Sequence, residues 1–259
     1  MSISNTYRFF VPADAIDADQ VVLNDSALAH QIGRVLRLRP GDRVLLLDGQ
    51  GSAYTVMLTA VGREQITGQI EQQETAGGEP AISLTLYVAL LRAERFEWVL
   101  QKGTELGVGM FVPVTCANSL PADRADARKL ARWRRILREA AEQSCRGRLP
   151  TIAEPQPFAA ACTQAATADP ALLLWEGSAP HLRETLRTQL ALPPDSPVPA
   201  DHRQPPTISL LSGPEGGITP AELTTATEHG IIPVSLGPRI LRAETAPIAA
   251  TAAIFYEFE

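Results

Sequence analysis

Two short loops near the end of the chain carry the residues best suited to bind a ligand. The first, Gly213-Pro214-Glu215-Gly216-Gly217, follows an apolar run at 207–211, and the second, Leu236-Gly237, ends an apolar run at 231–236. We expect each run to be a buried strand and each loop to lead into a helix. Strand ends of this kind place free backbone N–H and C=O groups at the carboxyl edge of a sheet, where open α/β sheets bind ligands.

The two loops together suit a flat heterocycle. Leu236, Ile240 and Leu241 offer apolar surface for its faces, and main-chain groups can read its polar edge. The first loop is not a Walker A loop, because no Lys-Ser/Thr follows its glycines, and it is not a GxGxxG fingerprint. A tight strand-to-helix connection also explains the first loop, since glycine supplies positive φ and proline presets a turn.

Two regions with different patterns of predicted secondary structure must position these loops. Residues 1–72 contain closely spaced short strands separated by glycine turns, which predicts a small β-barrel. Residues 73–80 are polar and rich in structure breakers, so they are predicted to be a linker. From 81 to 259 strands alternate with helices, which predicts a mostly parallel sheet covered on both faces. The expected fold class is therefore α/β, preceded by the β-barrel.

The expected elements follow from apolar periodicity and turn residues. In the first region strands are predicted at 7–11, 21–23, 44–48, 53–60 and 65–71, with a helix at 27–32. In the second region strands are predicted at 81–91, 111–115, 171–175, 207–211 and 231–236, and helices at 94–106, 126–144, 181–190, 220–229 and 245–256. Residues 191–206 hold six prolines and are predicted to form a surface loop. The last helix is apolar nearly all round, so we expect it to be buried on every side.

Composition narrows the class of protein. The 259 residues are 45% hydrophobic and 20% charged, which is enough for a sizeable core in one large domain or two smaller ones. No apolar run reaches the roughly 20 residues of a membrane span, and the first residues lack the layout of a signal peptide. Three widely spaced cysteines form neither a disulfide framework nor a CxxC pair, so a reducing cytoplasm is expected. No cluster of His, Cys and Asp has metal-ligand spacing, so no metal is expected.

The net charge of −6 argues by itself against a polyanionic partner, but positive charge is concentrated locally. Nine Lys or Arg against three acids occur at 124–148, and four Arg against one Asp occur at 34–43. Local basic faces of this kind can bind phosphates on a protein that is acidic overall. A solvated helix face is nevertheless the simpler explanation of Arg128, Arg132 and Arg135.

The glycine loops also match a known family. The segments 213–217, Ser235-Leu236-Gly237 and 239–246 resemble the SPOUT-class methyltransferases and, within that class, the RsmE family of 16S ribosomal RNA uridine-N3 methyltransferases. Further matching segments, in family order, are 35–38, 41–42, 101–108, 132–133 and 139–144. The chain departs from the family pattern at Arg92, which is usually Lys, at Asn118, which is usually Arg, and at Ala243, which is commonly Thr.

The resemblance implies a PUA-like RNA-binding β-barrel over 1–72 and a SPOUT methyltransferase domain over 81–259 that is tied in a deep C-terminal trefoil knot. It implies a cytoplasmic homodimer whose cofactor is S-adenosylmethionine and whose partner is 16S rRNA within the small ribosomal subunit. The cofactor-binding residues that it implies are Leu211, Gly213, Pro214, Glu215, Gly216, Leu236, Gly237, Ile240 and Leu241.

The reaction that the resemblance implies is methyl transfer to N3 of a uridine, and N3 must lose its proton before or during attack. Arg146, Arg242 and Lys102 are candidates for stabilising the uridine anion, and Glu139 is the candidate base. The implied RNA-binding residues are Arg8, Arg34, Arg37, Arg92 and Gln143. Two alternatives stay open: a ribose 2′-O-methyltransferase of the same class, and a non-catalytic RNA-binding ribosome assembly factor.

Overall fold

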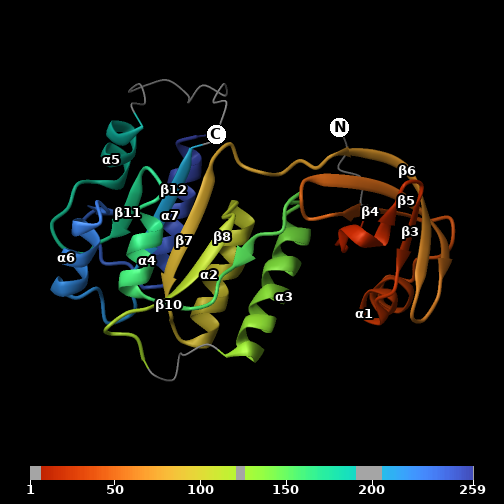
Figure 1. Ribbon diagram of the computed structural model, residues 1–259, viewed down its shortest axis with the longest axis horizontal. Helices are drawn as coiled ribbons and strands as arrows, with labels where there is room; N and C mark the ends of the chain where they lie inside the picture. The colour runs from red at the N-terminus through yellow and green to blue at the C-terminus, as the bar shows by residue number, and fades with distance from the viewer. Residues whose placement is uncertain (1–6, 121–125, 191–205, 259) are drawn as a thin grey trace. The chain divides into compact units, whose positions relative to one another are not determined.

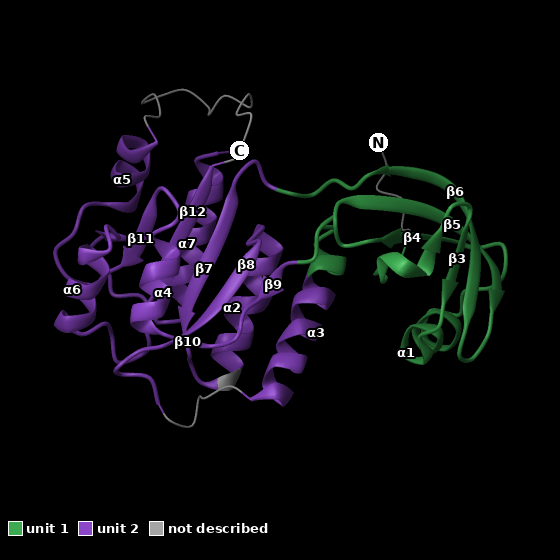
Figure 2. Cartoon of the chain, in the orientation of Figure 1, with its two compact units in different colours: residues 1–79, 141–149 green, residues 80–140, 150–259 purple. Residues whose placement is uncertain are grey.

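The computed structural model describes residues 7–120, 126–190 and 206–258. The chain folds into two compact units, Met1–Glu79 with Ala141–Leu149, and Pro80–Ala140 with Pro150–Glu259 (Figure 2). It therefore passes between the units three times. The sequence predicted a division near residues 73–80, but it gave no sign that a segment far along the chain belongs to the first unit.

The first unit is built on a six-stranded sheet. Its strand order is β1 (Arg8–Phe10), β4 (Arg43–Leu47), β5 (Ser52–Val61), β6 (Ile66–Thr75), β3 (Gln20–Leu23) and β2 (Ile16–Asp17). All pairs are antiparallel except β1 with β4. The order leaves β1 and β2 at the two ends of this sheet, and the β-barrel expected from the sequence stays a prediction.

Helical turns and an inserted segment complete the first unit. Helix α1 (Ser26–His30) begins where the Asp25 carboxylate accepts hydrogen bonds from the next N–H groups. It continues into a π-helical turn at Gln31–Val35, and a 3-10 turn at Ala13–Ala15 precedes β2. Ala141 and Leu149, from the inserted segment, pack with Phe10 and Leu47 in a small core, so this segment is an integral part of the unit.

The second unit is built on a parallel sheet. Its strand order is β10 (Gln156–Pro157), β8 (Met110–Thr115), β7 (Ser83–Ala89), β12 (Thr207–Ser212), β11 (Ala171–Leu174) and β13 (Ile232–Val234), with β9 (Thr151–Ile152) also paired to β8. Every pairing in this sheet is parallel. The central strands are buried on both faces, which explains their nearly continuous apolar sequences.

Helices cover both faces of this sheet (Figure 1). In β7, Leu84, Leu86 and Val88 face one core, while Tyr87 and Ala89 face the other. The first core contains side chains of α2 (Ala93–Leu106), α3 (Ala127–Gln143), α5 (Leu182–Gln189) and α7 (Thr245–Tyr256). The second contains side chains of α4 (Phe158–Ala165) and α6 (Pro220–Glu228). The α/β class with a parallel sheet is thus confirmed.

Several elements differ from the expectation. Helix α4 and the short strands β9 and β10 were not predicted, β6 runs into the predicted linker, and β13 is shorter than expected. Helix α7 is buried along one face in the single chain: Ala250 and Ile254 are buried, whereas Ala253 and Tyr256 are exposed, so burial of the other face stays a prediction that depends on the expected homodimer. Residues 191–205, most of the predicted proline-rich loop, lie outside the described residues. No helix among the described residues is long and apolar enough to cross a membrane.

Candidate cofactor site

Three loops of the second unit surround a cavity of about 640 Å³. They follow β11, β12 and β13, which are neighbouring parallel strands, so their carboxyl ends meet at one edge of the sheet. The volume lies within the roughly 300–1,000 Å³ typical of ligand pockets. The lining is Arg95, Leu174, Trp175, Glu176, Gly177, Ser178, Ala179, Ser212, Gly213, Pro214, Glu215, Gly217, Ile218, Val234, Ser235, Leu236, Gly237, Pro238, Arg239, Ile240, Leu241, Arg242, Ala243 and Ala246.

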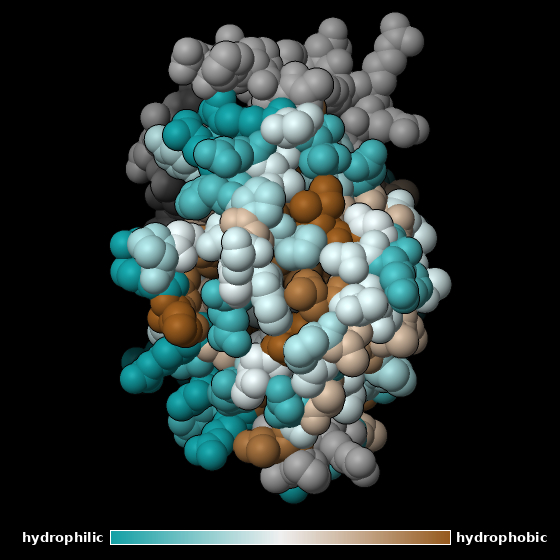
Figure 3. All heavy atoms as spheres, turned by 90° about the vertical axis from the view of Figure 1, so that its left-hand side faces the viewer, coloured by the Kyte–Doolittle hydropathy of each residue, from teal (hydrophilic) through white to brown (hydrophobic). Residues whose placement is uncertain are grey.

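The surface of the second unit is mixed in character on the side that carries α5 and α6. Seen from the side that carries α5 and α6, it is mainly hydrophilic, with apolar side chains visible in hollows between polar ones (Figure 3). The lining itself combines apolar side chains, such as Leu236 and Leu241, with charged ones and with glycine backbone. Such a lining can pack against an apolar ring and pair with its polar edge.

The first glycine loop is fixed by its turn and by the helix that follows. The Gly217 N–H donates to the Pro214 carbonyl at 2.9 Å, and Gly217 has φ +74°, a conformation that favours glycine. Thr219 and Glu222 then form a capping box at the start of α6, with Pro220 in its first turn. The loop therefore enters a helix whose start is determined locally by the sequence.

The second glycine loop, which follows β13, and the loop that follows β11, here called the third loop, are joined by backbone hydrogen bonds. The Ser235 N–H donates to the Pro180 carbonyl at 2.8 Å, and the Leu182 N–H donates to the Ser235 carbonyl at 2.9 Å. Gly237 has φ +103°, and its N–H donates to Ser235 Oγ at 3.1 Å. The ligand edge of the sheet is thus a connected set of loops. Ile240 stands out from it with 81% of its surface exposed.

Charged side chains gather where α2 meets the two glycine loops. Arg95 Nη1 lies 3.5 Å from Glu215 Oε1, and Arg95 Nε lies 3.8 Å from Glu244 Oε1. The Arg92 N–H also donates to Glu215 Oε1, at 3.5 Å. Glu244 Oε2 is buried and has no hydrogen-bond partner in the described part of the chain. Arg95 therefore stands between two carboxylates at the cavity and connects the first glycine loop to the start of α7.

Most of the predicted cofactor residues come together here. Seven line the cavity, namely Gly213, Pro214, Glu215, Leu236, Gly237, Ile240 and Leu241. Leu211 is buried in the core below the cavity, and Gly216 lies outside the lining. The binding roles of all nine stay predictions.

The sequence reasoning missed the third loop. Trp175, Glu176, Gly177 and Ser178 line the cavity, although they were not among the predicted residues. Their signal was present in the sequence, since here too an apolar strand ends in a short polar segment that contains glycine.

The four residues proposed for the reaction lie in different places. Arg242 is exposed and lines the cavity. Lys102 on α2 donates to both carboxylate oxygens of Glu105, at 2.8 and 2.9 Å. Glu139 on α3 is exposed and lies 3.6 Å from Arg135. Arg146 belongs to the first unit. Their roles in the reaction stay predictions.

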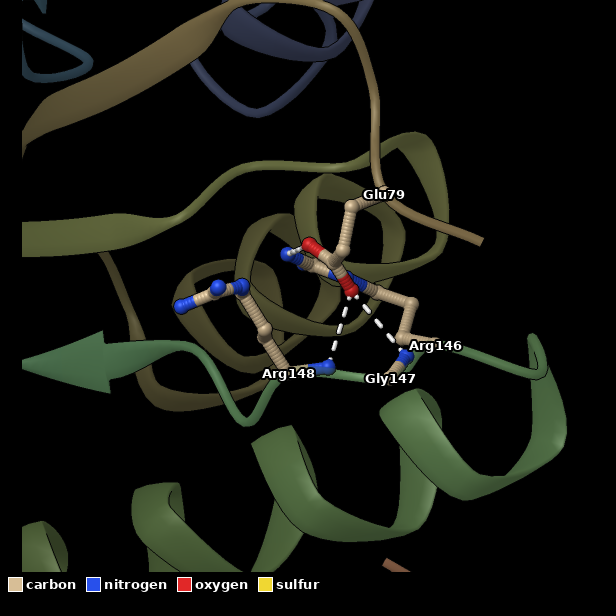
Figure 4. A network of polar contacts seen from close by, with 4 residues as sticks. All are labelled: Glu79, Arg146, Gly147 and Arg148. Carbon is tan, nitrogen blue, oxygen red and sulfur yellow. Dashed lines mark hydrogen bonds and ion pairs between the residues drawn. The ribbon is translucent and has the colours of Figure 1, made fainter. Parts of the chain in front are cut away.

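Arg146 is held by Glu79 within the first unit (Figure 4). Arg146 Nε and Nη2 donate to the Glu79 carboxylate at 3.3 and 2.7 Å. The N–H groups of Gly147 and Arg148 donate to Glu79 Oε1 at 3.1 and 2.9 Å. Only 3% of the Arg146 side chain is exposed. A buried guanidinium with these partners is what a structural ion pair requires.

The predicted RNA-binding residues are mostly on the surface. Arg34, Arg37, Arg92 and Gln143 are exposed. Arg37 has φ +59°, which is uncommon for a residue with a side chain. Arg8 is half-buried, and its Nη1 donates to the Cys145 carbonyl at 3.4 Å. Arg92 belongs to the second unit and the other four to the first.

Two buried thiols lie in the core below the loops. Burial, together with a smaller contribution from the nearby Glu222 carboxylate, raises the pKa of Cys162 to about 11. Burial likewise raises the pKa of Cys116 well above its ordinary value. Both thiols are therefore neutral at physiological pH. Within the described ranges no group of three His, Cys, Asp or Glu side chains is placed to hold a metal ion.

Comparison with known proteins gives one consistent picture. A family model described as an RNA methyltransferase domain matches residues 78–255, and one described as an RNA methyltransferase PUA domain matches 23–71. Ribosomal RNA small subunit methyltransferase E of Synechocystis is 36% identical over 96% of this chain and 77% of the relative. The Bacillus subtilis protein of the same name is 30% identical over 89% of this chain and 88% of the relative.

A solved structure agrees with these relatives. Ribosomal RNA small subunit methyltransferase E from Neisseria gonorrhoeae, bound to S-adenosyl methionine, matches with a TM-score of 0.81 and 32% identity, over 96% of this chain and 97% of that one. The PUA-like assignment of the first unit and the methyltransferase assignment of the second are thereby confirmed. The chain belongs to the ribosomal RNA small subunit methyltransferase E family.

Proposed function

We propose that this chain transfers the methyl group of S-adenosylmethionine to N3 of a uridine in the 16S rRNA of the small ribosomal subunit, in the cytoplasm. The observation that carries the proposal is the three-loop cavity, in a chain whose relatives are named for methylation of small-subunit rRNA. A further relative, the Neisseria gonorrhoeae protein, was crystallised bound to S-adenosyl methionine.

The residues of the cavity fit the donor. Apolar surface from Leu236 and Leu241 suits the faces of an adenine, and the glycine loops offer main-chain groups for its edge. Glu176 and Glu215 can accept hydrogen bonds from hydroxyl or ammonium groups. S-adenosylmethionine supplies an activated methyl group on its sulfonium. The protein supplies positioning and a polar environment.

The chain must also manage the proton on uridine N3. Arg242 lines the cavity and is exposed, so its guanidinium is the best placed of the predicted cations to stabilise a uridine anion. Glu139 as base, with Lys102 and Arg146 as further cations, remains part of the proposal on the resemblance alone. The target base must leave any stack to reach the cavity.

RNA binding completes the proposed reaction. Arg8, Arg34, Arg37 and Gln143 would contact the RNA from the first unit, and Arg92 from the second. The family model for an RNA methyltransferase PUA domain matches 23–71 and supports the assignment of Arg34 and Arg37, while the other three residues rest on the resemblance. Contacts from arginines to phosphates fix the register of the RNA and carry no sequence information directly.

We also propose a homodimer and a trefoil knot in the second unit. The exposed side of α7, which carries Ala249, Ala252, Ala253 and Tyr256, is apolar, and a second copy of the chain could cover it. Light scattering then gives twice the chain mass of 27.9 kDa. A mass equal to a single chain contradicts the dimer. The knot rests on the family resemblance, with α7 as the segment that passes through a loop.

Calorimetry with S-adenosylmethionine separates the enzyme from an RNA-binding assembly factor. Binding is expected. The absence of both heat and a thermal shift would argue for the factor. Nucleoside analysis after methyl transfer separates the base from the ribose, because 3-methyluridine supports the proposal and a 2′-O-methyl nucleoside supports the alternative.

A further inference from the structure

We propose that Asn118 is a positioning residue for the donor cavity, because its side-chain amide holds the first glycine loop in the shape that lines the cavity. The inference rests on the proposed function of the cavity as the methyl-donor site. Asn118 itself lies outside the lining, in the turn that follows β8.

The contact uses both hydrogens of one amide group. Asn118 Nδ2 donates to the Gly216 carbonyl at 2.9 Å and to the Gly217 carbonyl at 3.1 Å. A side-chain amide has two donor hydrogens on its nitrogen, enough for one bond to each of these two consecutive peptides. Its orientation is therefore assigned by the two acceptors.

The turn that carries Asn118 is itself held in place. The Cys116 N–H donates to Ser119 Oγ at 3.0 Å, and the Ser119 N–H donates back to the Cys116 carbonyl at 3.1 Å. The Ala117 N–H donates to Glu222 Oε1 at 2.8 Å. The other oxygen of Glu222 accepts from Thr219 in the capping box of α6. Asn118 thus projects from a rigid support that is joined to the far end of the same loop.

The amide also determines where a backbone donor points. Because the Gly217 carbonyl faces Asn118 and a trans peptide is planar, the Ile218 N–H points away from Asn118. No hydrogen-bond acceptor for this N–H is found in the described part of the chain. The Ile218 nitrogen lies 3.5 Å from the point where a Cβ on Gly213 would stand, and both residues line the cavity. Ile218 as a whole is 7% exposed and lines the cavity, so a bound ligand can supply the partner for this N–H.

The contact with Asn118 also explains why residue 216 is glycine, a residue type that cofactor binding does not require there. Gly216 lies outside the lining, yet a Cβ added to it would stand 2.8 Å from the Asn118 Cβ. A side chain at this position would force the loop away from the amide. Glycine here is therefore required for close packing against Asn118.

The test is calorimetry with S-adenosylmethionine on three variants. Asn118→Ala removes both hydrogen bonds and is expected to weaken donor binding about tenfold, since each bond contributes about 0.5–1.5 kcal/mol. In methyl transfer it should raise KM for the donor and leave kcat within about threefold, because it touches neither reactant. Asn24→Ala, which removes an exposed side-chain bond to Gln65 in the first unit, should bind like wild type.

Asn118→Asp adds a readout that a general loss of stability would not reproduce. At pH 8 its carboxylate faces two carbonyl oxygens and binding is weak. Donor binding by Asn118→Asp should therefore be weaker than by Asn118→Ala, which places no charge against these two carbonyls. The neighbouring titratable groups, Glu176 beside Gly217 and Glu222 beside Ala117, are the same in wild type and in the two Asn118 variants. Wild type that binds no donor overturns the proposed function. Wild type and both Asn118 variants binding equally overturns the positioning role alone.

Discussion

The buried ion pair between Glu79 and Arg146 gives the sharpest prediction about residue roles. Arg146→Ala removes a guanidinium whose side chain is 3% exposed and leaves the Glu79 carboxylate with only the two backbone N–H donors. Removing one partner of a buried ion pair costs about 3–5 kcal/mol. The lower end is expected here, because 22% of the Glu79 side chain is exposed and it keeps two backbone donors. For a domain of roughly 60–100 residues, each kcal/mol lowers Tm by about 4–8 °C. The transition of the first unit should therefore fall by at least about 12 °C.

Urea and thermal unfolding, followed by circular dichroism, measure this loss. Glu79→Ala should destabilise the protein to a similar extent, and the double variant Glu79→Leu/Arg146→Met should lose clearly less than the sum of the two single changes. Calorimetry with S-adenosylmethionine serves as the control, because the cavity residues belong to the second unit and donor binding should not change. An Arg146→Ala protein that keeps wild-type stability but loses methyl transfer would refute the structural account and support the role in the reaction predicted from the sequence.

Three further predictions concern the cavity and the core below it. Arg242→Ala should lower kcat about 100-fold with little change in donor affinity, because a group that stabilises developing charge acts in the transition state. A kcat equal to that of wild type would show that Arg242 has no role in the reaction. Gly217→Ala and Gly230→Ala place a side chain at similar positive φ, +74° and +79°, so each should cost about 1–3 kcal/mol of stability. Of the two, only Gly217→Ala should also weaken donor binding in calorimetry, since its Cβ would stand 2.9 Å from Glu176 Oε1 at the cavity; equal binding by both variants would contradict this. The pKa of the Cys162 thiol is about 11 in the folded protein and about 8.5 in the unfolded chain. The contribution of this thiol to stability is therefore present below pH 8.5 and is lost as the pH rises toward 11. Cys162→Ala should therefore lose less stability than wild type between pH 8 and pH 10 in urea unfolding, and equal losses would show that the thiol does not titrate in this way.

The two glycine loops could be predicted because their signal is local. In the first, an apolar strand, a glycine turn and a capped helix follow one another, and in the second an apolar strand ends at a glycine. The parallel order of β12, β11 and β13 brings the strand ends together. The third loop carries a weaker form of the same pattern at Gly177 and was missed. Helix α4 was missed as well, because it is short and rich in alanine and its apolar residues do not form a distinct stripe.

Contacts between distant residues were beyond sequence reasoning. Glu79 lies 67 residues before Arg146, so the ion pair left no periodic signal in the sequence, and the role of Arg146 in the reaction stays a prediction. Asn118 is separated from Gly216 by 98 residues, and the sequence showed only a departure from a family pattern. Helix α7 shows a different limit, because its uniformly apolar sequence did not reveal which side faces the core.

The most direct measurement is methyl transfer from labelled S-adenosylmethionine to small ribosomal subunits that lack the modification, followed by digestion to nucleosides. The account predicts label in 3-methyluridine from a single position of the 16S rRNA, at a stoichiometry approaching one per subunit. Label in a 2′-O-methyl nucleoside, or no transfer by a protein that binds the donor, would contradict it.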